Sequence, residues 1–123
     1  MGVTDPAGAA RFFAEKLLAG DVQEATRCFG PRGVMLSADG TEVVGQESIA
    51  EILAQIAAWE LPLRIRTGRI VQAGTVAMAT QIWDRDISGF TVSSVARLVL
   101  QETCGRWSIL VASPWAELPK HRY

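Results

Sequence analysis

Residues 61–115 read LPLRIRTGRIVQAGTVAMATQIWDRDISGFTVSSVARLVLQETCGRWSILVASPW, and this stretch decides the fold. It alternates apolar, β-branched runs with short breaks that contain glycine, which is the pattern of consecutive antiparallel strands. We predict four strands in it, at residues 63–72, 76–84, 91–102 and 106–114. Ala73-Gly74 and Cys104-Gly105 are predicted to be short hairpin turns, and the turn over residues 86–89 is predicted to be longer.

Helical patterns precede these strands. The first helix is expected to begin at Pro6, after a cap at Asp5 or Thr4, and to stop at Ala19-Gly20. A second short helix, with Asp21 as its cap, is expected over residues 22–29, and Gly30-Pro31 would end it. The third helix opens near residues 45–48 and carries one apolar stripe at helical spacing, formed by Ile49, Ile52, Leu53 and Ile56.

A small hairpin is expected between the second and third helices. We predict a short strand at residues 34–37, a turn at residues 38–41 and a return strand at residues 42–44. Asp39-Gly40 is a strong turn signal, because glycine accepts a positive φ. Helices followed by one long antiparallel sheet predict an α+β fold, in which the helices cover one face of the sheet.

Composition limits the partners and the location of the protein. The chain has 123 residues, 49% of them hydrophobic, and a formal net charge of −1. Residues 1–123 are expected to form one domain with its own core, and residues 117–123 a flexible polar tail. The charge argues against nucleic-acid and membrane partners, and no apolar run approaches the roughly 18 residues of a membrane span. No signal peptide is recognised, and Cys28 and Cys104 are most simply reduced thiols, so we expect a cytoplasmic protein.

Several of the predicted strands are apolar on both faces. In residues 76–83, VAMATQIW, neither alternating set is clearly polar, whereas an antiparallel strand with one wet face should alternate. The simplest explanation is a sheet whose concave face meets the helices and whose convex face meets a second subunit. The sequence therefore predicts a homodimer through the outer face of the sheet.

Three stretches carry a family resemblance: residues 12–29, with FF, LAGD and CF; residues 44–49, VGQESI; and residues 105–109, GRWSI. The chain resembles the nuclear transport factor 2-like superfamily, and within it the SnoaL-type polyketide cyclase and ketosteroid isomerase group. The resemblance covers about residues 7–116 and implies a cone-shaped, strongly bent, mostly antiparallel sheet that wraps around N-terminal helices and encloses a pocket. It also implies a homodimer and favours a bacterial origin. These motifs are turns, caps and core positions, so they specify fold better than chemistry.

The catalytic residues of ketosteroid isomerases do not carry over to this chain. Their oxyanion-donating tyrosine corresponds approximately to Phe13, and their protonated aspartate to Ala96. Their basic aspartate corresponds to a strand that here reads VMLS over residues 34–37, while Asp39 lies in the following turn. A phenyl ring and a methyl group cannot move a proton or stabilise an enolate. The resemblance therefore disfavours steroid isomerisation and leaves it uncertain whether the protein is an enzyme.

Three charged residues are the remaining catalytic candidates: Asp39, Asp84 and Arg97. Asp84-Arg85-Asp86 is similar to the Asp–Arg–Asp set of epoxide hydrolases in this superfamily, but neighbouring strand residues point to opposite faces, which favours a solvated strand end. Arg97 interrupts an apolar strand, where it either anchors an anionic ligand or lies on the outer face. His121 is the only histidine, so no metal site is expected, and no cofactor is implied.

A second set of residues is placed in the expected pocket as ligand contacts: Phe13, Met35, Trp59, Gln81, Trp83 and Trp115. Aromatic walls suit planar ligands, but the same side chains also suit core packing. An inward Gln81 would bind a ligand carbonyl, and an outward one would be an ordinary strand amide. Both interpretations stay open for Gln81, Trp83 and Trp115, whereas Trp59 is also expected to close the third helix.

These observations lead to three functional hypotheses. The first is a protein that binds a small apolar or aromatic molecule in an aromatic-lined pocket, with catalysis weak or lost. The second is a cyclase, isomerase, dehydratase or epoxide hydrolase that acts on a polyketide-like or terpenoid-like substrate. The third is a module for non-catalytic interaction with other proteins.

Overall fold

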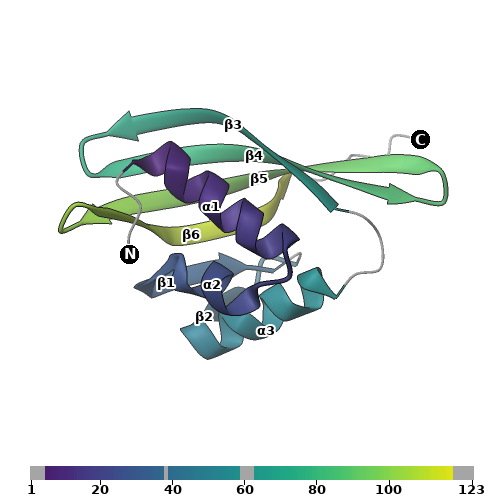
Figure 1. The fold of residues 1–123 in the computed structure, drawn as a ribbon, viewed down its shortest axis with the longest axis horizontal. Coiled ribbons are helices and arrows are strands. Elements are labelled where there is room, and N and C mark those ends of the chain that lie inside the picture. Colours follow the sequence, from purple (N-terminus) through teal and green to yellow (C-terminus); the bar gives the residue numbers. More distant parts are fainter. Residues whose placement is uncertain (1–4, 38, 59–62, 118–123) are drawn as a thin grey trace.

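The computed structural model describes residues 5–37, 39–58 and 63–117, except for the side chains of residues 87 and 115–117. Its elements are α1 (Pro6–Leu18), α2 (Val22–Arg27), β1 (Phe29–Leu36), β2 (Glu42–Val44), α3 (Gln46–Ala57), β3 (Leu63–Ala73), β4 (Val76–Ile87), β5 (Phe90–Thr103) and β6 (Arg106–Glu117). The strands form one sheet in the order β2-β1-β6-β5-β4-β3. Only the β1–β6 pair in this order is parallel. The α+β prediction, with a mostly antiparallel sheet, is confirmed (Figure 1).

Side-chain caps fix the starts of the first two helices. The Asp5 side chain accepts a hydrogen bond from the Gly8 amide at 2.6 Å, and Pro6 occupies the first helical turn. The Asp21 side chain accepts one from the Glu24 amide at 3.2 Å. Each cap satisfies an amide that has no partner within the helix. The predicted caps are confirmed, and Gly20 adopts a positive φ of 76° after α1.

The predicted end of the second helix is wrong. α2 stops at Arg27, and β1 already begins at Phe29 and runs through Gly30-Pro31, five residues ahead of the strand predicted at residues 34–37. Tertiary contacts decide this boundary. The carbonyl of Cys28 accepts a hydrogen bond from the Ile109 amide at 2.8 Å, and the Phe29 ring packs edge-on against Phe13 with centroids 5.8 Å apart. Pairing with a strand eighty residues away is invisible to local helix propensity.

The turns of the long sheet are tighter than predicted. β4 and β5 are joined by Ser88-Gly89 alone, with φ values of 49° and 83°, so the longer turn predicted over residues 86–89 is wrong. Two successive positive φ values match the right-handed twist of a hairpin. Cys104-Gly105 has them too, and the short hairpin turn predicted there is confirmed. The first hairpin turns at Gly74-Thr75 rather than at Ala73-Gly74, since Ala73 pairs with Val76.

The described helices cover one face of the sheet, which we call the inner face, and none of them lies on the opposite, outer face (Figure 1). Alternation along β4 and β5 separates the two faces. Ala77, Ala79, Gln81 and Trp83 of β4 and Ala96, Leu98 and Leu100 of β5 are buried on the inner face. Their outer neighbours are more exposed, and Val76 and Met78 each retain 42% of their accessible surface. The part of the outer face around Val76 and Met78 is therefore apolar and open in the single chain.

The core lies between the inner face and the helices. Phe13 and Leu17 of α1, Leu53 and Ile56 of α3, and Met35 of β1 belong to one buried cluster with the inner residues of β4, β5 and β6. Burial of each side chain of this size contributes about 1.5–3 kcal/mol to the stability of the folded state. Among the described helices, none has the length and apolar character that a membrane crossing requires.

Candidate functional site

Gln81 lies on the inner face and is fully buried, at the point where α1 crosses the sheet. Its Nε2 donates to the carbonyl of Ala10 at 3.0 Å and to Thr67 Oγ1 at 3.4 Å, and its Oε1 accepts from Trp83 Nε1 at 3.1 Å. The amide thus joins α1, β3 and β4. A buried amide needs such partners, and in this structure the protein supplies them.

The apolar residues predicted to contact a ligand are core residues in the structure. Phe13 and Met35 have no exposed surface, and Trp83 retains 1%. Phe13 packs against Phe29, and the Trp83 indole is held by Gln81. The structure therefore brings Phe13, Met35, Gln81 and Trp83 into one cluster. Trp59 lies outside the described residues, and Trp115 lies in β6 with its side chain outside the description.

The other buried polar groups on the helix side of the sheet are neutral hydroxyls. Thr26 Oγ1 donates to the carbonyl of Val22 at 2.7 Å, and Ser94 Oγ donates to the carbonyl of Pro114 at 3.4 Å. Burial is the main factor that raises the pKa of the Cys28 thiol, to about 12, so it stays protonated and is a poor nucleophile. Every buried side-chain nitrogen and oxygen in the described part of the chain has a hydrogen-bond partner.

Asp39 is an exposed turn residue. Its carboxylate accepts hydrogen bonds from the Ser37 hydroxyl and from the Thr41 amide, the latter at 3.0 Å. These bonds lower the pKa of Asp39 to about 2, with the Ser37 hydroxyl as the largest cause. A carboxylate with such a low pKa is a weak base near neutral pH. Its geometry is that of a residue which closes the turn between β1 and β2.

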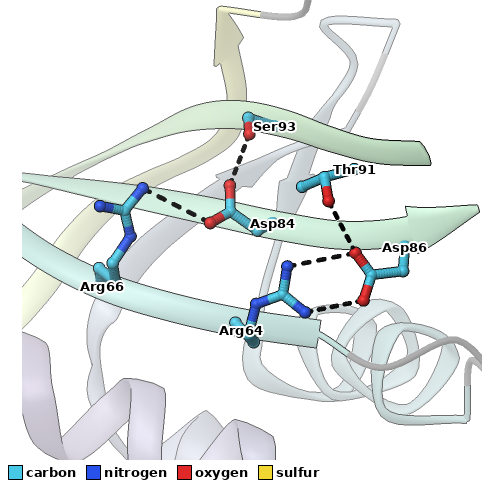
Figure 2. Close-up of polar contacts among 6 residues, drawn as sticks. All are labelled: Arg64, Arg66, Asp84, Asp86, Thr91 and Ser93. Carbon is cyan, nitrogen blue, oxygen red and sulfur yellow. Dashed lines mark hydrogen bonds and ion pairs between the residues drawn. The ribbon is translucent and has the colours of Figure 1, made fainter. Parts of the chain in front are cut away.

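Asp84 and Asp86 form a polar ladder on the outer face, and each is held between an arginine and a hydroxyl (Figure 2). Asp84 accepts from Arg66 Nη2 at 3.5 Å and from Ser93 Oγ at 2.6 Å. Asp86 accepts from Arg64 at 2.9 and 3.2 Å and from Thr91 Oγ1 at 2.9 Å. The arginines come from β3 and the hydroxyls from β5, so the ladder crosses three strands. It points away from the inner face.

The contacts in the ladder favour the charged forms of Asp86 and Arg64. Hydrogen bonds from Arg64, and then from Thr91, lower the pKa of Asp86, and the same contact with Asp86 raises the pKa of Arg64. Both changes favour the ion pair. Because Asp84 has 9% of its surface exposed on the outer side, the structure does not bring it to the pocket expected on the inner side.

Two arginines lie on opposite faces of the same hairpin. Arg97 pairs across the strands with Thr80 and Ser113, on the outer face. Arg85 lies between the two ladder aspartates in sequence but alternates with them, so it is on the inner side, two residues after Trp83. Burial lowers the pKa of Arg85 from its ordinary value. Arg85 was not among the candidate site residues named from the sequence. Its alternation with Asp84 and Asp86 could have indicated that it lies on the face opposite to theirs.

Residues 5–37, 39–58 and 63–117 contain no cluster of side chains that could hold a metal ion. No three histidine, cysteine, aspartate or glutamate side chains in these ranges approach one another closely enough to hold an ion. Asp84 and Asp86 neighbour each other on the outer face, but each already binds an arginine.

Comparisons with known proteins find relatives by structure and not by sequence. No protein-family model matches the chain, and no curated protein sequence matches it. Among solved structures, a domain of unknown function with a cystatin-like fold from Nostoc punctiforme superposes with a TM-score of 0.75 at 15% identity. That match covers 91% of this chain and 75% of the other.

Two further solved structures extend the likeness. A ketosteroid isomerase-like protein from Erwinia carotovora atroseptica matches with a TM-score of 0.71 at 14% identity, over 86% of this chain and 88% of that one. A hypothetical protein with a ketosteroid isomerase-like fold from Catenulispora acidiphila, in complex with trimethylamine, matches with a TM-score of 0.68 at 15% identity, over 85% and 82%. At these identities the likeness concerns the backbone. The predicted resemblance is confirmed at that level: the chain has the fold of ketosteroid isomerase-like proteins and of nuclear transport factor 2-like proteins, such as one of unknown function from Shewanella oneidensis with a TM-score of 0.67 at 16% identity, over 86% of this chain and 92% of that one.

Proposed function

We propose that the protein binds a small, largely apolar molecule in a pocket that the bent sheet and its helices enclose. The observation that carries this proposal is the chemistry of the inner face. The described buried polar side chains on the inner face are the Gln81 amide and the Ser94 hydroxyl, and Thr26 adds a hydroxyl on α2. All three are hydrogen-bonded within the protein. Such a surface can exclude water from an apolar ligand, but it offers no described acid–base pair for proton transfer.

The aromatic residues of the inner side supply the contact area in this proposal. Phe13, Met35 and Trp83 are in the core cluster, and Gln81 bonds to the Trp83 indole. Trp59 and Trp115 stay in the proposed lining on sequence grounds alone. One solved structure with the same fold holds trimethylamine, a small molecule with three methyl groups. That complex supports small-molecule binding as a use of this fold.

The four tryptophans allow a direct test by nuclear magnetic resonance. Each indole N–H of Trp59, Trp83, Trp107 and Trp115 gives one resonance, and the Trp83→Phe and Trp107→Phe variants assign two of them. Progesterone and emodin serve as a steroid-like and a polyketide-like probe. We expect one of them to shift the Trp83 resonance with a Kd near or below about 100 μM, the range of modest pockets. Trp83 pairs with Ser94, which bonds to Pro114 near the end of β6, whereas Trp107 lies near the start of β6. The Trp107 resonance should therefore not respond.

The outcome can contradict the proposal in two ways. If neither probe shifts any indole resonance at saturation, the described apolar lining does not serve steroid-like or polyketide-like ligands. If the Trp107 resonance responds and the Trp83 resonance does not, the ligand lies elsewhere. The control for folding is the spectrum of each variant without ligand. Apart from the lost indole resonance, it should match the spectrum of the unchanged chain.

We propose in addition that two copies of the chain associate through the outer face. Val71, Val76 and Met78 expose 47%, 42% and 42% of their surface there, next to the half-buried Ile82 and Val99. Apolar neighbours of this kind on adjacent strands are typical of protein interfaces. Light scattering should give a dimer for the unchanged chain and a monomer for Met78→Glu. Leu18→Glu, at a 46% exposed position on the helix side, is the matched control and should remain dimeric.

A further inference from the structure

β1 carries more residues than its partner strand along one stretch. Between the pairs Phe29–Ile109 and Val34–Val111, the chain advances five residues along β1 but only two along β6. The surplus residues leave the ladder as a bulge that includes Gly30, Pro31 and Arg32. A bulge bends its strand and redirects the side chains it carries. Pro31 fits such a position, because it needs no ladder amide.

A hollow of about 330 Å³, which we call the outer hollow, lies beside this bulge. Three strands line it: Gly30, Pro31 and Arg32 of β1, Gln101 and Thr103 of β5, and Ser108 and Leu110 of β6. It opens on the outer face, because Gln101 pairs with Ser108 and these two alternate with the buried Leu100 and Ile109. The outer hollow is thus separated from the proposed inner pocket by the sheet.

Gly30 keeps one side of the outer hollow open. A Cβ atom at this position would lie 3.0 Å from Ser108 Oγ and 3.7 Å from Ser108 Cβ. The backbone of Gly30 is outside the left-handed region, so any residue could adopt its conformation. What the glycine provides here is therefore space beside the Ser108 hydroxyl rather than a special φ.

The charge of the lining is one-sided. Arg32 is the one cation among the lining residues, and no carboxylate is among them. Glu102 lies between Gln101 and Thr103 but alternates with them, so its side chain points to the opposite face. Two hydroxyls and one amide add neutral hydrogen-bonding groups, while Leu110, Pro31 and the arginine stem offer apolar contact.

We propose that the outer hollow binds a small organic carboxylate. The Arg32 guanidinium would bind the carboxylate in the two-pronged geometry that arginine favours, and the Ser108 and Thr103 hydroxyls would donate to its remaining lone pairs. The apolar part of the ligand would lie on Leu110 and Pro31. One guanidinium matches a single carboxylate in charge, and the volume is at the lower end of small-molecule sites.

Benzoate titrated into the full-length chain tests this site, with benzamide as the neutral molecule of the same shape and inorganic phosphate as a second anion. Benzoate should shift the backbone amide resonances of Gly30, Thr103 and Ser108 in a saturable way. Benzamide should bind about tenfold more weakly, since it lacks the charge that strengthens the arginine contact. Equal effects of benzoate and benzamide, or equal binding of phosphate, would overturn the carboxylate assignment.

Variants locate the binding. Arg32→Gln should weaken benzoate about tenfold, whereas Arg69→Gln, which removes the same charge from an exposed position on β3, should leave it unchanged. Gly30→Ala should weaken it through the added methyl group. Loss of binding in both arginine variants would mean a non-specific charge effect and would refute the site. If the protein is a dimer in which benzoate cannot enter the outer hollow, the site is refuted as well. None of these outcomes changes the interpretation of the tryptophan experiment, because that experiment tests the proposed inner pocket.

Discussion

The two faces of β4 differ in the kind of polar group that they carry. On the inner face, Gln81 is neutral and joins three elements through three hydrogen bonds. On the outer face, Asp84 and Asp86 are charged, and each is held by an arginine from β3 and a hydroxyl from β5. A neutral amide tolerates complete burial once its bonds are made, whereas a carboxylate is stable where its charge stays paired and close to water. The inner face therefore builds the core, and the outer face holds the charge.

The largest expected effect comes from the apolar core against the inner face. Phe13→Ala removes a fully buried ring that packs on Phe29, so the free energy of unfolding should fall by about 3–5 kcal/mol. Urea denaturation measures it. Leu18→Ala on the same helix, where 46% of the residue is exposed, should cost less than about 1 kcal/mol. Similar losses in the two variants would refute the assignment of Phe13 to the core.

Gln81 gives the sharpest test of the inner face. Gln81→Ala removes the acceptor of the Trp83 indole and the donor to the Ala10 carbonyl, so about 2–3 kcal/mol of stability should be lost. The indole resonance of Trp83 should move in the same variant. Gln72→Ala is the control, because this exposed amide donates only to the Gly74 carbonyl and should change stability by less than about 0.5 kcal/mol. An unchanged stability of Gln81→Ala would mean that the amide is not a structural link.

Asp84 tests the outer face. Asp84→Asn keeps the shape of the side chain but weakens its bonds to Ser93 and Arg66, and should lower stability by about 1–2 kcal/mol. Denaturation of Asp84→Asn, Ser93→Ala and the double variant measures whether the two residues act together. A coupling energy near zero would show that the 2.6 Å contact contributes nothing to stability. Asp86 would then be the remaining outer-face carboxylate in the comparison of the two faces.

The sequence predicted this architecture because its signals are local. Apolar, β-branched runs separated by short breaks that contain glycine identified the strands of the long sheet, and Asp5 and Asp21 marked the helix starts. The errors occurred where distant contacts decide. Phe29 is extended because β6 pairs with it, and residues 86–87 stay in β4 because Ser88-Gly89 alone can turn the chain.

The candidate site was less predictable for the same reason. The partners of Gln81 come from Ala10 and Thr67, and the arginines of the ladder come from β3, so neither set is adjacent in sequence. Sequence alternation separated Asp84 from Arg85, but it could not say which of the two faces the helices. The bulge at Gly30-Pro31-Arg32 was equally hidden, because a glycine-proline pair after a helix ordinarily indicates only a stop.

The smallest expected effect is the pH dependence of the ladder at Asp86. Because Arg64 and Thr91 lower the pKa of Asp86 in the folded state, unfolding raises it back toward about 3.9. The stabilisation is present above that value and is lost as the pH falls through the lower folded pKa. Asp86→Asn should therefore be less stable than the unchanged chain at pH 7, and the difference should shrink as the pH falls below about 3.9 and through the lower folded pKa.

Salt separates this contribution from the rest. Arg64 and Asp86 expose 50% and 45% of their side chains, so 1 M sodium chloride should reduce the difference at pH 7. Asp39→Asn is the matched control. The pKa of Asp39 is also lowered, to about 2, but by hydroxyl and amide groups and without an arginine. Its effect should shrink at low pH in the same way and respond less to salt. An equal salt response in both variants would show that the ion pair adds nothing beyond the neutral hydrogen bonds, and the charged outer face would lose its distinction from the neutral inner one.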